Sequence, residues 1–174
     1  NRCSQILPHE MLKPFLETKN IFSLQRMAKI YFCFIKYSTT KNVLNNAISQ
    51  ICDLLIVDEH AVSQYTLCAL IYYMESPSQN LTDLQIFHKP SIQAAILHFL
   101  ESEYEDDQNR AIRIIFELIK RKCINSFHAE MLFPFVENVD KPELQISALS
   151  SIYESIRNDI ICDKSELLNF LISL

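Results

Sequence analysis

The chain of 174 residues contains no glycine. Glycine most readily adopts the positive φ angles of tight hairpin turns, and glycine-rich loops let the backbone approach phosphate groups closely. A chain without it is difficult to build from β-hairpins and cannot form a glycine-rich phosphate-binding loop. We therefore expect an all-α fold, in which turns of Asn, Asp, Ser and Pro join the helices.

Composition and charge narrow the class of protein further. Hydrophobic residues make up 49% of the chain and charged residues 21%, as in a globular protein with a substantial core. The net charge of −5 argues against a general nucleic-acid binder, because such proteins present a positive field to phosphates. The longest apolar runs, residues 30–35 and 69–74, are far shorter than the roughly twenty residues that span a membrane. We expect no membrane partner, no signal peptide, and a chain cut from a longer protein.

The cysteines suggest a reducing compartment. None of them forms a Cys-x-x-Cys pair, and most lie among apolar residues, at positions 3, 33, 52, 68, 123 and 162. We expect reduced core thiols and a cytoplasmic or nuclear protein. Cys123 directly follows Lys120, Arg121 and Lys122, a cation cluster that could lower the pKa of its thiol and make it a reactive candidate.

The residues of catalytic and metal sites are present but scattered. The histidines are at positions 9, 60, 88, 98 and 128, and no two of them lie at helical metal-ligand spacing. His9 and Glu10 lack the second histidine of a zinc-protease motif. The acidic stretch 101–107 is typical of a solvated turn. We expect no catalytic residue, metal or cofactor; an uncommon helical enzyme stays an alternative.

Helical segments alternate with polar breaks in units of about 40 residues. The units cover approximately residues 3–37, 43–75, 91–122 and 126–158, followed by a truncated unit at 163–174. A shift of 120 superposes residues 10–17 on 130–137 and, without a gap, Leu24-Gln25 on Leu144-Gln145 and Ala28 on Ala148. Shifts of 84 and 41 give weaker matches, the latter pairing Ala28 with Ala69 and Tyr31 with Tyr72. Two helices in each such unit are typical of an α-solenoid.

The fourth unit resembles a HEAT repeat. It has the leucine before a helix-A proline, the Asp and Pro of the turn, and the alanine of helix B, at Leu132, Pro134, Asp140, Pro142, Leu144, Ala148 and Ile152. Gln145 departs from the family pattern, which has Arg there. Armadillo repeats are similar, and that reading stays open. The resemblance implies one domain over residues 1–174, a right-handed α-solenoid of about four and a half helix pairs, and a scaffold or adaptor role.

The repeat alignment also predicts a binding face on the second helix of each pair. If Leu144, Ala148, Ile152 and Ile156 face the core, then positions 150, 154 and 157 point outward. Mapped through the repeats and their flanks, the predicted protein-binding residues are apolar in the first half, namely Ile30, Phe34, Tyr37, Ile71 and Met74. Charged residues follow in the second half: Arg110, Arg113, Glu117, Arg121, Glu154 and Arg157. Burial of the apolar half is an equally open alternative.

The leading functional hypothesis is therefore a non-catalytic scaffold or adaptor that binds a peptide or amphipathic helix of another protein. One alternative is a nucleic-acid-associated solenoid with a local basic strip at Arg110, Arg113, Lys120, Arg121 and Lys122. The other is the helical enzyme.

Overall fold

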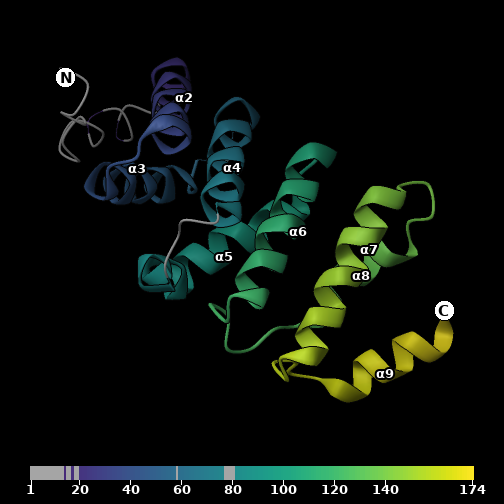
Figure 1. Ribbon diagram of the computed structural model, residues 1–174. Coiled ribbons are helices and arrows are strands. Elements are labelled where there is room, and N and C mark those ends of the chain that lie inside the picture. Colours follow the sequence, from purple (N-terminus) through teal and green to yellow (C-terminus); the bar gives the residue numbers. More distant parts are fainter. Residues whose placement is uncertain (1–13, 15–16, 18–19, 58, 77–80) are drawn as a thin grey trace. The chain divides into compact units, whose positions relative to one another are not determined.

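The computed structural model describes residues 14, 17, 20–57, 59–76 and 81–174, without the side chains of 81–83. This part of the chain contains eight α-helices, labelled α2 to α9, and no strand, which confirms the all-α prediction (Figure 1). The chain divides into two compact units, each larger than a repeat of the sequence. The first unit is Asn1–Ile86 and the second unit is Phe87–Leu174. Apart from Pro14 and Glu17, the helix expected over residues 3–17 lies outside the described residues.

The first unit is built on three helices, α2 (Ile21–Tyr37), α3 (Lys41–Leu54) and α4 (His60–Glu75). Each lies within three residues of the bounds that the sequence pattern predicts. The side-chain oxygen of Asn20 caps α2 by accepting a hydrogen bond of 3.1 Å from the amide of Ser23. α2 packs against both α3 and α4, and the short 3-10 helix η1 (Leu81–His88) follows.

The second unit consists of two helix pairs and one further helix. They are α5 (Pro90–His98) with η2 (Phe99–Glu101), α6 (Glu105–Lys120), η3 (Ala129–Leu132) with α7 (Phe133–Glu137), α8 (Pro142–Arg157) and α9 (Lys164–Ser173). α6 packs on α5 and η2 in one pair, α8 on η3 and α7 in the other, and α6 also packs against α8.

Two helix starts in this unit follow from their residues. Pro90 begins α5, because the fixed φ of proline suits the first helical turn. Asp163 caps α9, and its side chain accepts hydrogen bonds from the amides of Ser165 and Glu166.

The burial pattern supports the shift of 120 residues between α2 and α8. Leu24 and Ala28 are buried, as are Leu144 and Ala148 at the equivalent positions. The agreement extends along the helices: buried positions of α2 fall on buried or half-buried positions of α8, and no buried position falls on an exposed one. Each fully buried Leu or Ile contributes about 1.5–3 kcal/mol relative to exposure, so such a shared pattern records a shared core face. The shift of 41 fails at one pair, because Tyr31 is buried whereas Tyr72 is exposed.

Without glycine, α6 and α8 end on residues that take positive φ angles, Lys122 at 57° and Asp159 at 56°. The amides of Lys122 and Cys123 donate to the carbonyls of Ile119 and Leu118, which is the bonding pattern of a Schellman cap. Asp159 and the residue after it repeat this pattern at the end of α8. Besides the expected Asn, Asp, Ser and Pro, a lysine, Lys122, therefore also serves as a turn residue.

The turns that follow these two caps are joined by a short parallel bridge. The amide of Phe127 donates to the carbonyl of Ile160 at 2.8 Å, and the amide of Cys162 donates to the carbonyl of Phe127 at 3.0 Å. The ring of Phe133 stacks on that of Phe170 at 3.8 Å between centroids, which holds α9 against the start of α7.

Candidate functional site

An exposed apolar stripe lies on α2. Ile30 is 44% exposed, Tyr37 is 73% exposed and Phe34 is half-buried. Their spacing of four and three residues places the three side chains on one face of the helix. The structure thus leaves accessible the part of the predicted apolar face that the first unit contributes through α2.

The part of that face predicted on α4 is wrong. Ile71 is 8% exposed and Met74 is fully buried, so neither is accessible to a partner. The physical reason is that α4 is apolar over most of its circumference and the structure buries nine of its sixteen residues. A helix of that kind is a core helix, and the open alternative of burial applies to it.

Tyr72 is the aromatic residue that α4 exposes instead. Its hydroxyl donates a hydrogen bond of 3.3 Å to the carbonyl of Lys36, and its ring meets Phe32 edge-on at 6.4 Å. These contacts hold Tyr72 beside the last turn of α2, where Tyr37 also lies. The repeat alignment did not predict the exposure of Tyr72, because the shift of 41 pairs it with the buried Tyr31.

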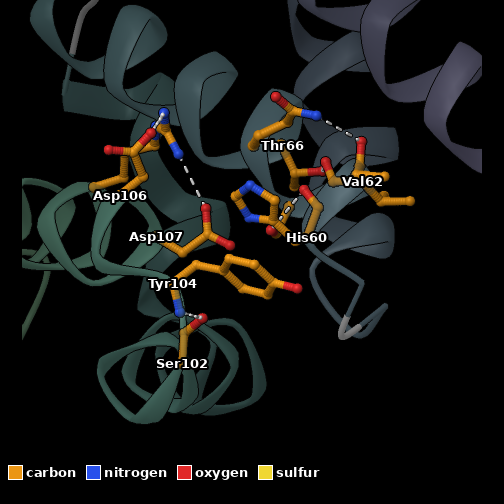
Figure 2. Close-up of polar contacts among 11 residues, drawn as sticks. His60, Val62, Thr66, Ser102, Tyr104, Asp106 and Asp107 are labelled. Carbon is orange, nitrogen blue, oxygen red and sulfur yellow. Dashed lines mark hydrogen bonds and ion pairs between the residues drawn. The ribbon is translucent and has the colours of Figure 1, made fainter.

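The charged half of the predicted site lies in the second unit, where its cations are engaged by acids. Arg110 donates to Asp107 and to Asp106, each at 3.0 Å (Figure 2). Farther along α6, Lys120 and Arg121 both contact the carboxylate of Glu117, at 3.3 and 3.2 Å. Arg113 is exposed on the same helix.

The outward orientation expected for Glu117 and Glu154 is wrong, because both are buried, and the core position expected for Ile156 is wrong, because it is 49% exposed. The carboxylates tolerate burial because cations from the next turn cover them; Arg157 contacts Glu154 at 3.5 Å. The amide of Asn158 donates both to Glu154 and to the carbonyl of Ile119, at 3.2 and 3.3 Å. This network ties the C-terminal ends of α6 and α8 together.

The candidate thiol, Cys123, is buried. Burial raises the pKa of the Cys123 thiol, and the smaller opposing effect comes from Arg121 alone among the three cations of the preceding run. A raised pKa keeps the thiol protonated, so the reactive thiolate that the cation cluster predicts is wrong.

Among the residues that the structure describes, no group of three His, Cys, Asp or Glu side chains is placed to hold a metal ion. No helix in the same set is both long and apolar enough to cross a membrane.

A second accessible apolar surface lies at the end of the second unit, where sequence reasoning did not look. A cavity of about 260 Å³ opens between the last turn of α8 and α9, lined mainly by Ile156, Ile161, Leu167, Leu168 and Leu171. The signal that could have found it is the run of apolar positions in residues 146–156 at spacings of three and four.

Comparisons with protein-family models, with curated proteins and with solved structures gave no match to this chain. Its function must therefore be argued from its own residues.

Proposed function

We propose that the chain is a non-catalytic helical-repeat scaffold or adaptor of HEAT or armadillo type, which binds a peptide or amphipathic helix of a partner protein on the exposed face of α2. One observation carries the proposal. Ile30, Phe34 and Tyr37 occupy positions that α8 fills with Ser150, Glu154 and Arg157, although the two helices share one burial pattern. The fold does not require apolar residues at these positions, so their presence on α2 calls for another explanation.

Binding supplies that explanation. Exposed aromatic side chains bury a large apolar area at little entropic cost, and they commonly dominate interface energies. Tyr37 is the best anchor candidate because it is the most exposed of the three and lies on the last turn of its helix. Tyr72 adds a second ring next to that turn.

The repeat architecture within this proposal is supported by the helix packing. α2 lies against α4 and α6 against α8, each the second helix of its pair. Gln145, the departure from the HEAT pattern, still bonds across its pair, because its side-chain amide donates to the carbonyl of Val136 at 2.7 Å. A cytoplasmic or nuclear location is supported by the cysteines of the described residues, of which all five are free thiols.

The nucleic-acid alternative has less support. Phosphate binding needs cations that can exchange counterions for phosphate oxygens. Arg110, Lys120 and Arg121 instead contact acids of their own helix, and leaving those acids would cost the pairs already formed. The enzyme alternative has less support as well, because its candidate nucleophile, Cys123, is buried and has a raised pKa.

The test is a peptide-display selection against the 174-residue chain, followed by calorimetry with the best peptide. We expect Tyr37→Ser to weaken binding by about tenfold or more, with Ile30→Ser weaker by less. Tyr104→Ser is the matched control, because Tyr104 is an exposed tyrosine in the second unit that lies outside its apolar surface. Equal loss in Tyr37→Ser and Tyr104→Ser, or no loss in either, would contradict the assignment to α2.

A further inference from the structure

A long apolar stripe runs along the exposed side of α8. Its members are 40–67% exposed and lie three, four and three residues apart, at Ile146, Leu149, Tyr153 and Ile156. That spacing aligns the four side chains on one face over most of the helix length. The face is distinct from the α2 surface and lies in the other unit.

α9 extends the same surface. It begins where α8 ends and runs away from it on the side that does not carry α6 (Figure 1). Leu168, Leu171 and Ile172 are exposed on it, and two of them line the cavity that Ile156 also lines. Together the stripe and α9 present seven large apolar side chains that are 40–75% exposed. An interface of standard size takes about 800 Å² from each partner.

The stripe is symmetric along its helix. Ile146 and Ile156 are equally far from Ser151, and so are Leu149 and Tyr153. Two copies of α8 packed antiparallel would therefore match Ile146 with Ile156 and Leu149 with Tyr153, each pair occurring twice. A surface that is complementary to itself under a twofold rotation is what a symmetric dimer requires.

The charges at the two ends of α8 fit the same arrangement. Glu143 and Arg157 are both exposed on one flank of the stripe, near opposite ends of the helix. An antiparallel twofold keeps that flank on the same side in both copies, so Glu143 of each copy faces Arg157 of the other. A parallel twofold would instead put these charges on opposite flanks of the two copies, so the opposite-charge pairs would not form.

We propose that the α8–α9 face is the interface of a symmetric homodimer, in which α8 packs antiparallel to α8 of a second copy. The α9 helix of each copy then lies beside the start of the other copy's α8, where Val139 is exposed. Each copy brings its own α2 surface, so dimerisation makes the proposed adaptor bivalent.

Sedimentation of the 174-residue chain over a wide concentration range tests the proposal. We expect a species of twice 20.3 kDa that dissociates on dilution. Leu149→Glu should weaken the dimer by about tenfold or more, because it places two carboxylates in the apolar centre of the interface. Ile56→Glu is the matched control, since Ile56 is a strongly exposed apolar residue in the first unit; it should leave the dimer intact. Circular dichroism should show that both variants keep the wild-type helix content.

The end charges test the antiparallel register. Glu143→Arg should weaken the dimer, because it sets two arginines against each other. A wild-type chain that stays monomeric throughout would overturn the proposal and leave the face to a helix of some other protein. A dimer that survives Leu149→Glu, or one that Glu143→Arg leaves unchanged, would overturn it as well. None of these results depends on Tyr37, so they are separable from the test of the α2 surface.

Discussion

Gln145 donates its side-chain amide to the carbonyl of Val136 at 2.7 Å, across the turn between α7 and α8. Two more glutamines of the second unit make bonds of the same kind. Gln108 donates to the carbonyl of Ser102, and Gln93 donates to the carbonyls of Phe87 and Cys123. Helix ends leave carbonyls without partners, and these glutamines supply the donors that turn residues would otherwise provide.

The first prediction is that Gln145→Leu destabilises the second unit by about 1–3 kcal/mol. The leucine keeps the size of the side chain but removes the donor, so the carbonyl of buried Val136 loses its partner. Denaturant unfolding followed by circular dichroism measures the change. Gln85→Leu is the control because Gln85 is exposed. An equal effect in both variants would show that the Gln145 bond contributes nothing.

The second prediction concerns the alanines at the closest helix contacts. Ala28, Ala69 and Ala148 are all fully buried, as the repeat alignment predicts. Ala148→Leu should lower the free energy of unfolding by about 1–3 kcal/mol, because the added methyl groups overpack a filled contact. Thermal unfolding checks this, with Arg26→Leu as an exposed control on α2, the helix that carries the equivalent Ala28. An unchanged melting temperature for Ala148→Leu would mean that the contact has room to spare.

The third prediction is a stabilisation. Lys122 has a φ of 57°, where its side chain crowds the backbone and glycine would not. Lys122→Gly should raise the free energy of unfolding by about 0.5–1 kcal/mol, after allowance for the greater freedom of glycine in the unfolded chain. Lys122→Ala keeps the crowding atom and should bring no gain. A gain of equal size with alanine would trace the effect to the lost charge instead.

The fourth prediction uses the pH dependence of Tyr31. Its hydroxyl is buried and has no hydrogen-bond partner among the described residues, and burial, with a smaller contribution from Asp53, raises the pKa of this phenol above 10.0. The folded state therefore holds the proton more tightly than the unfolded state. The resulting stability is present below pH 10 and is lost as the pH rises above it.

Tyr31→Phe should be neutral or slightly stabilising at pH 7, because no hydrogen bond is lost. Above pH 10 the variant should become more stable than the wild type by a growing margin. Urea unfolding of both proteins at several pH values measures this difference, in which the other tyrosines cancel. A difference that stays constant across the alkaline range would contradict the raised pKa.

Much of the fold could be read from the sequence because its signals are local. The missing glycine and the three-to-four spacing of apolar residues predict the helices, and the ungapped match of Leu24 and Ala28 to Leu144 and Ala148 predicts their buried faces. The binding face could not be transferred in the same way. Ile71 and Met74 were placed by carrying the orientation of α8 onto α4, but α4 packs over more of its surface than α8 does. Nothing in the residues of α4 themselves tells how many neighbours will cover them.

The exposure predicted for the charged residues is wrong for a different reason. A carboxylate such as Glu117 looks solvated in a one-dimensional pattern, yet Lys120 and Arg121 from the next turn cover it and allow its burial. Cys123 shows the converse, because a preceding run of cations does not lower a pKa when burial outweighs it.

The bridge between Phe127 and Ile161 links the protection of two turns against hydrogen exchange. The amide of Phe127 and the amide of Cys162 are both held by it, so neither can exchange until the two turns separate. Separating them also removes support from the start of α9. The two amides should consequently exchange at a common rate set by one opening event, and the segment from residue 123 to α9 should behave as a single cooperative element rather than as a fraying end.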